Sequence, residues 1–238
     1  NFDLREFVRL LVSTETYQKV AVIYDPTAAE PHRYNGPALK RMTAEQLWDS
    51  LLTLIATNEW AYQRPTAQEM QTVYGIDMST VDYEEFEQSF KNYNDYRRDL
   101  SRTRNKNCGL NGLTLVRASE LPQPSGSSHL LRQFGQGDRE AIETAKQSAT
   151  VPQILTLFNG WMTHAMLSKG SVIYDSVSQQ KTLQSAVDTI FLAILTHEPD
   201  ADMRKAAEAE IKQSPNPAIG CGNLIWALLN TREFLFID

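Results

Sequence analysis

In this chain of 238 residues, the polar side chains that could carry out chemistry are few and scattered along the sequence. The four histidines, His32, His129, His164 and His197, have no His-x-x-x-His spacing that would predict a metal site, and no Cys-x-x-Cys pair is present. Ser125-Gly-Ser-Ser-His129 places hydroxyls near an imidazole, but it lacks a Gly-x-Ser-x-Gly elbow and a preceding strand. No phosphate-binding loop or dinucleotide fingerprint occurs. The sequence therefore predicts no metal, no cofactor and no complete catalytic motif.

The polar group with the most candidate chemistry lies in and after a loop-like stretch from Glu120 to Arg139. Long loops with little regular structure inside a compact domain tend to be functional. We predict a binding surface made of Arg132, Asp138, Arg139, Asn159 and Trp161. The alternative is structural, because an arginine such as Arg132 or Arg139 can bridge loop carbonyls and carboxylates and so hold the loop.

Two further patterns have both a chemical and a structural interpretation. Glycoside hydrolysis needs two carboxylates about 5–10 Å apart, and a chain with 29 acidic residues offers many pairs. Trp48, Trp60 and Trp161 have rings that stack on sugars, but tryptophans at helical spacing more often belong to a core. Asp200-x-Asp202 resembles a calcium loop without its glycine and distal glutamate, so we predict a helix cap there.

The overall composition is that of an ordinary globular domain. Hydrophobic residues make up 42% and charged residues 22% of the chain, which excludes a disordered tail, a fibre and a disulfide-dense miniprotein. With 23 basic and 29 acidic residues, the net charge is −6, so the chain lacks the basic footprint of a nucleic-acid binder. Its longest apolar run, Ile190 to Leu195, is far shorter than the roughly 20 residues of a membrane span.

Apolar spacing and punctuation by Pro and Gly predict helices that would position these side chains. A first helix with one apolar stripe follows Asp3 and ends near Thr14, and Thr43-Ala-Glu-Gln46 has the spacing of a capping box. Further helices are predicted over 151–167, interrupted at Asn159-Gly160, and over 182–195, 200–212 and 218–230. We predict an all-α fold, an irregular helical bundle with long ordered loops and at most a short β element, in one domain of residues 1–238.

Residues 58–118 are predicted to form an insertion within this domain. A helix from Asp82 to about Arg104 carries an aromatic stripe, begins acidic and ends basic. That polarity complements the helix macrodipole, and a phosphate-binding patch is the alternative use of the basic end. Leu113 to Arg117 is the best candidate for a short strand.

The two cysteines leave the redox compartment open. Cys108 and Cys221 are far apart in sequence, and they form either one long-range disulfide in an oxidising compartment or two unrelated thiols in a reducing one.

Four stretches in the right order resemble a known family. They are D-L-R-E-F-V-R-L-L-V-S-T-E-T-Y-Q (Asp3 to Gln18), L-K-R-M-T-A-E-Q-L-W-D-S-L (Leu39 to Leu51), the Ser119 to Gly160 block with F-G-Q-G-D-R-E, and W-A-L-L-N-T-R-E-F-L-F-I-D (Trp226 to Asp238). Together they resemble the planctomycete-specific domain of unknown function. That domain is the C-terminal part of large exported proteins that also carry a planctomycete cytochrome-associated domain.

The resemblance implies a mostly helical domain, a bacterial source and an extracytoplasmic location, periplasmic or secreted. Export in turn favours a bond between Cys108 and Cys221. No catalytic residues are known for the family, so none are carried over. The family's upstream part is missing, so we expect Asn1 to lie inside a longer protein. Residues 58–118 have no counterpart that can be matched, and the chain has no Cys-x-x-Cys-His for attaching a c-type haem.

Two functional hypotheses follow. The preferred one is a non-catalytic scaffold or partner-docking module of a larger cytochrome-associated protein. Its partners would be other domains of the same longer chain or a co-exported protein. The alternative is an extracytoplasmic hydrolase that acts on a polymer such as a polysaccharide.

Overall fold

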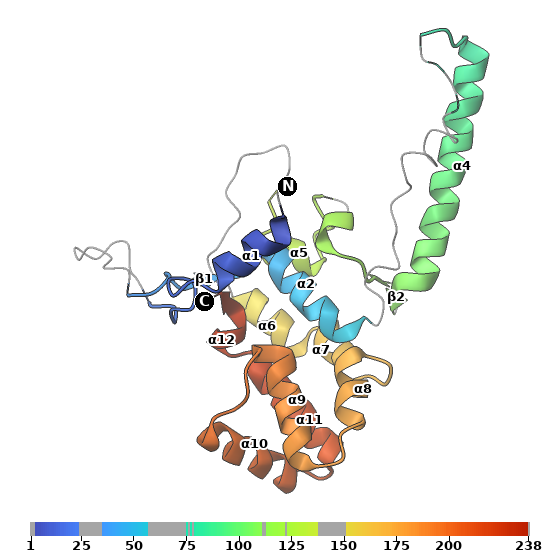
Figure 1. The fold of residues 1–238 in the computed structure, drawn as a ribbon. Coiled ribbons are helices and arrows are strands. Elements are labelled where there is room, and N and C mark those ends of the chain that lie inside the picture. Colours follow the sequence, from blue (N-terminus) through green and yellow to red (C-terminus); the bar gives the residue numbers. More distant parts are fainter. Residues whose placement is uncertain are drawn as a thin grey trace.

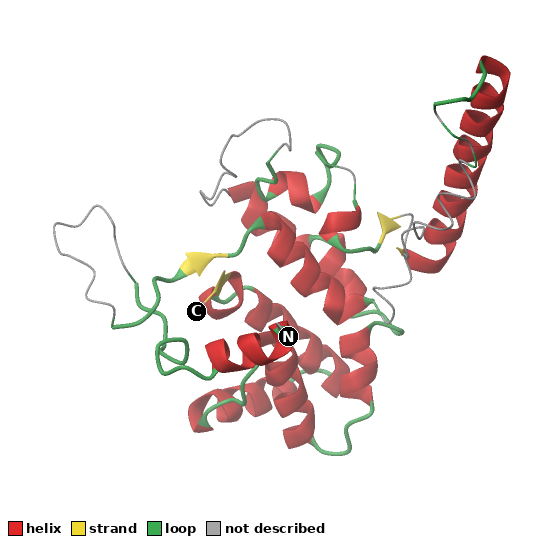
Figure 2. Ribbon diagram, turned by 45° about the horizontal axis from the view of Figure 1, so that its top comes forward, coloured by secondary structure: helices red, strands yellow, loops and turns green. Residues whose placement is uncertain are grey.

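The structure is a computed structural model, and it describes residues 3–23, 35–56, 75, 77, 79–110, 113–121, 123–137 and 151–237. Within these residues the chain is mainly helical, which confirms the all-α prediction (Figure 2). The predicted helix that begins at Asp138 falls outside them. None of the described helices combines the length and the apolar character that crossing a bilayer requires.

Figure 1 shows how the helices are arranged. The helices are α1 (Leu4–Val12), α2 (Ala44–Ile55), α4 (Tyr83–Cys108), α5 (Leu130–Gln133), α6 (Val151–Asn159), α7 (Trp161–Met166), α8 (Val172–Ser178), α9 (Leu183–Leu195), α10 (Ala201–Gln213), α11 (Pro217–Leu229) and α12 (Arg232–Leu235), with one 3₁₀ turn, η1 (Ala118–Glu120). Two antiparallel pairs of two-residue strands complete the described elements: β1 (Lys40–Arg41) with β4 (Phe236–Ile237), and β2 (Gly109–Leu110) with β3 (Leu113–Thr114).

The centre of the core is α2. Its first turn is closed by the predicted capping box: the Thr43 hydroxyl accepts from the Gln46 amide at 3.2 Å, and the Gln46 side chain accepts from the Thr43 amide at 2.9 Å. Trp48 and Leu52 on this helix are completely buried. Asp200 likewise caps α10, where its carboxylate accepts from the Met203 amide at 2.8 Å, so the prediction of a helix cap is confirmed.

Trp48 attaches the segment that follows α4 to the core. Its indole Nε1 donates to the carbonyl of Val116 at 2.9 Å, and the carboxylate of Asp49 accepts from the amide of Ala118 at 2.8 Å. Val116 is fully buried, and its carbonyl accepts the hydrogen bond from Trp48. The strand predicted over 113–117 is therefore limited to Leu113–Thr114. Figure 1 shows α4, which lies in the predicted insertion, extending away from the other helices.

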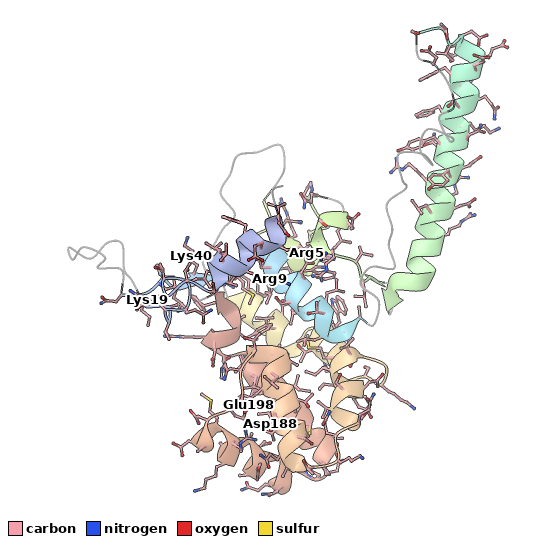
Figure 3. All side chains as sticks on the ribbon, in the orientation of Figure 1. Arg5, Arg9, Lys19, Lys40, Asp188 and Glu198 are labelled. Carbon is pink, nitrogen blue, oxygen red and sulfur yellow. The ribbon has the colours of Figure 1, made fainter. Side chains whose placement is uncertain are left out.

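The helices α9, α10 and α11 pack together in the C-terminal part. Asp188 of α9, labelled in Figure 3, forms an ion pair with Arg204 of α10. The backbones of α10 and α11 approach so closely that a Cβ atom on Gly220 would lie 2.5 Å from the Cα of Ile211. Only glycine fits at position 220 without a shift of one helix.

The first helix shows an exposed apolar stripe. α1 ends at Val12, close to the predicted end, and Asp3 caps it, but none of its side chains is buried. Figure 3 labels Arg5 and Arg9 on its polar side. Among its apolar residues, Leu4 is 75% and Phe7 61% exposed.

Replacing Trp48 with Phe tests the indole hydrogen bond. We expect Trp48→Phe to lower the free energy of unfolding by about 2–3 kcal/mol, because it leaves a buried carbonyl without a donor and opens a small cavity. Trp226→Phe is the matched control, since Trp226 is 39% exposed, and should lose less than about 1 kcal/mol. Urea unfolding followed by circular dichroism measures both, and equal losses would contradict a special role for Trp48.

The close approach of α10 and α11 gives a second test. Gly220→Ala should lower the free energy of unfolding by at least about 2 kcal/mol, because the new methyl group meets backbone that cannot move alone. Gly222→Ala on the same helix meets only the methyl groups of the Leu167 side chain, the nearest at 3.3 Å. It should be neutral, or stabilising by up to about 1 kcal/mol through helix propensity. The prediction fails if thermal unfolding ranks the two variants the other way.

Candidate functional site

The predicted surface in the long loop is described only in part. Asp138 and Arg139 lie outside the described residues. Arg132 is exposed on α5, and its Nη1 donates to the carbonyl of Gln136 at 3.2 Å, which is the loop-holding role given above as the alternative. Asn159 is exposed at the end of α6. Trp161 begins α7 and packs edge-on against Trp48, with ring centroids 6.2 Å apart, so it belongs to the core.

Buried amides hold this loop against its neighbours. The side chain of Gln136 accepts from the Ser125 amide at 3.0 Å, and Gln153 of α6 donates to the Gln133 carbonyl at 3.0 Å. Arg41 of β1 donates to Gln153 at 2.9 Å. The Nε2 of Gln136 is buried and has no hydrogen-bond partner among the described residues. Nothing in the sequence pattern singles out these glutamines, because glutamine is ordinary at exposed positions and only the fold shows that they are buried.

His129 also has a structural role. Its Nδ1 accepts from the Leu131 amide at 3.3 Å and so caps α5. Its ring lies 4.6 Å from that of Trp48, and burial lowers the pKa of the imidazole. Ser125 thus takes part in the buried amide network and His129 caps α5, instead of the two residues pairing as nucleophile and base.

His197 joins the turn after α9 to α12. Its Nδ1 lies 2.8 Å from the carbonyl oxygen of Glu198, and its Nε2 lies 2.5 Å from the carboxylate of Glu233. Both ring nitrogens therefore lie beside oxygen atoms, one in the turn and one on α12. The pair is close to half exposed, so its contribution to stability is that of a surface ion pair.

A large groove is formed by α8, the start of α9, the end of α10 and α11. Its volume is about 1110 Å³. Its walls are mainly apolar and include Ile219, Ile225 and Trp226. The polar groups that line it are hydroxyls, amides, one thiol and the ammonium groups of Lys181 and Lys212. Among the described residues along it, none carries a carboxylate or an imidazole.

Small residues at the start of α11 make room for this groove. Ala218, Gly220 and Gly222 follow one another at every second position, and Pro217 opens the helix after Asn216. Gly220 lets the two helices approach, while Gly222 faces the groove beside Leu167. This run of small residues is the sequence signal that could have indicated the groove, but small residues serve many roles in helices.

Trp226 separates this groove from a second one. The second groove has a volume of about 650 Å³ and lies between α9, α10, α11 and α12. Trp226 lines both, while Glu210 and Glu233 line only the second. The indole ring thus presents apolar surface on two sides.

Cys221 lies in the wall of the larger groove. Its side chain is half-buried, and burial raises the pKa of its thiol, so the reduced residue is mainly protonated at neutral pH. The side chain of Cys108 lies outside the described residues, and the disulfide between the two stays a prediction. No group of three or more His, Cys, Asp or Glu side chains suited to a metal ion occurs among the described residues.

The comparisons with known proteins give a family but no activity. The family model PSD1, described as a protein of unknown function (DUF1553), matches residues 1–211. No curated protein and no solved structure matches the chain. The family match ends within α10, so the closing stretch from Trp226 to Asp238 lies beyond it. It covers more than half of the chain, and the chain therefore belongs to the PSD1 family of proteins of unknown function.

Proposed function

We propose that the domain is a non-catalytic docking module that binds an amphipathic, acidic segment of another protein in the groove of α8, α9, α10 and α11. The observation that carries the proposal is the groove itself, with its apolar walls and its two lysines. We further propose, on the family resemblance, that such a module belongs to a larger exported, cytochrome-associated protein, periplasmic or secreted. The bound segment would then come from another domain of the same longer chain or from a co-exported protein.

The size and lining of the groove favour a polypeptide segment. At about 1110 Å³ the groove is slightly larger than the range of roughly 300–1,000 Å³ for small-molecule pockets. Ile219 is 45% and Trp226 39% exposed on its walls, so a partner gains by covering them. Removing apolar surface from water is worth about 25 cal/mol per Å². An amphipathic helix laid into an apolar groove is a common way to achieve this burial.

The charges of the lining favour acidic residues on that segment. Two lysines line the groove: Lys181 just before α9 and Lys212 near the end of α10. Lys212 forms an ion pair with Glu208 at 2.9 Å, while Lys181 is exposed. Carboxylates flanking an apolar stripe would meet these ammonium groups at the rim, where such pairs mainly set orientation and specificity.

The hydrolase hypothesis depends on a different part of the chain. Its site included Asp138 and Arg139, which lie outside the described residues, and no described feature favours it. Arg132 and Trp161 already have structural partners.

A pair of synthetic helical peptides tests the docking proposal. Each has about 16 residues and one face of Leu and Phe, and the polar face carries Glu in one and Lys in the other. We expect the acidic peptide to bind with a Kd of roughly 10–100 µM and the basic one at least tenfold more weakly. Isothermal titration calorimetry measures both, and an equal affinity for the two peptides would overturn the charge argument.

Variants locate the binding. Ile219→Glu puts a carboxylate in the groove wall and should weaken the binding of the acidic peptide at least about tenfold. Leu192→Glu is the matched control, because Leu192 is similarly exposed, at 47%, but lines neither groove. In reduced Cys108→Ser protein, the acidic peptide should also slow the alkylation of Cys221 by iodoacetamide. Binding that survives Ile219→Glu and leaves Cys221 unprotected would reject the groove as the site.

A further inference from the structure

A second surface, independent of the groove, lies on α4. This helix of 26 residues has its main contacts, among the described elements, with β2 and β3 at its carboxyl end. Figure 3 shows side chains standing out along most of it with no other described helix beside them. Three of its aromatic residues are exposed, Tyr83 by 76%, Phe86 by 40% and Phe90 by 54%, while Tyr93 and Tyr96 are of intermediate exposure.

These aromatic residues form the start of a heptad seam. Tyr83, Phe86, Phe90 and Tyr93 follow a 3-4-3 spacing, which Arg97 and Leu100 continue as 4-3. The rings of Phe86 and Phe90 stack with centroids 6.3 Å apart, and the guanidinium of Arg97 lies 5.7 Å from the ring centre of Tyr93. The seam is therefore continuous along one side of the helix, which is the pattern for packing against another helix.

The charges flanking the seam differ between its two halves. Residues 82–88 contain four carboxylates and no basic side chain. Residues 95–104 contain four arginines and two aspartates, and the aspartates pair with Arg98 and Arg102 on the same helix at 3.1 and 3.4 Å. These pairs are exposed, so they neutralise the basic half only in part.

Two copies of this helix complement each other in one orientation only. A parallel pair would set acidic against acidic and basic against basic halves, which is unfavourable. In an antiparallel pair centred on Phe90, the acidic residues 82–88 lie opposite residues 92–98 of the other copy, which contain Arg97 and Arg98 and one aspartate, Asp95. If Phe90 faces Phe90 of the second copy, Tyr83 comes opposite Arg97, an aromatic and a cation that attract each other.

We propose that α4 is a self-association arm that pairs antiparallel with α4 of a second copy of this chain, centred on Phe90. The seam from Tyr83 to Leu100 spans about 27 Å at the helical rise of 1.5 Å per residue. One such helix pair gives an interface at the small end of the specific range, so the dimer is weak, with a Kd of roughly 1–100 µM.

Charge reversal tests the orientation. Light scattering coupled to gel filtration should show wild-type protein moving from monomer to dimer between roughly 1 and 300 µM. Reversal of the acidic half, with Glu84→Lys, Glu85→Lys and Glu87→Lys together, should raise the Kd at least tenfold, about 1.4 kcal/mol. Reversal of the basic residues opposite the acidic half, with Arg97→Glu and Arg98→Glu together, should do the same.

Mixing the two reversed proteins gives a more specific readout than either alone. The first variant is basic in both halves of α4 and the second is acidic in both, so each repels itself at both ends of the seam. The mixed pair sets a basic half beside an acidic half at both ends, so the mixture should associate more tightly than either variant by itself. Lys205→Glu on α10 is the control for a charge change away from α4 and should leave the Kd unchanged. Circular dichroism confirms that the helical content of each variant is preserved. Wild-type protein that stays monomeric throughout, or reversals without effect, would overturn the proposal.

Cysteine cross-linking tests the register. In a Cys108→Ser, Cys221→Ser background, Phe90→Cys should form a disulfide-linked dimer under mild oxidation, because each Phe90 meets its own counterpart. Asn92→Cys, exposed on the opposite side of the helix, should not. Tyr83→Cys should also stay monomeric, since residue 83 meets itself only in a parallel pair. A dimer linked through Tyr83→Cys but not through Phe90→Cys would replace the antiparallel model with a parallel one.

Discussion

The buried indole of Trp48 is the constraint on which the arrangement of the chain depends. The ring is completely excluded from solvent, so its one polar atom must find a partner inside the protein, and it finds the carbonyl of Val116, 68 residues away. Asp49, the next residue, fixes the amide of Ala118. Together they bring the chain back to the core after α4. The long helix can therefore project from the body while α2 keeps its packing.

Most polar groups near this core are occupied by structural contacts. His129 caps α5 and covers Trp48, Arg132 holds the Gln136 carbonyl, and Gln153 bridges α6 to β1 and to the loop. Buried polar groups need such partners, because an unmet donor or acceptor costs about as much as a hydrogen bond contributes. The described surfaces that a partner could cover are mainly apolar. They are the groove along α11, the stripe on α1 and the aromatic seam of α4.

Local sequence patterns predict the long helices well. The features that they do not predict are short helices and features that depend on contacts between distant residues. The capping box at Thr43 and the cap at Asp200 act within one turn, so their residue types and spacing are enough. The short helices α5 and α8 carry too few residues for a periodic pattern. The groove depends on how closely Gly220 lets α11 approach α10, a distance between helices that no local spacing encodes. The role of Arg132 was open for the same reason, since it depends on where the loop carbonyls lie.

The residue at which α4 ends changes how the charges along this helix are interpreted. A helix that ended at Arg104 would have Arg102 and Arg104 in its last turn, where the macrodipole accounts for them. The helix instead continues to Cys108, so Arg97 lies 11 residues, about three turns, before its end. The macrodipole acts within the first and last turn, so it explains the carboxylates at the start of α4 but not Arg97 and Arg98. These arginines lie along the side of the helix, where Arg98 pairs with Asp95 and Arg97 lies over Tyr93, and a neighbouring helix of opposite charge order would give them further partners.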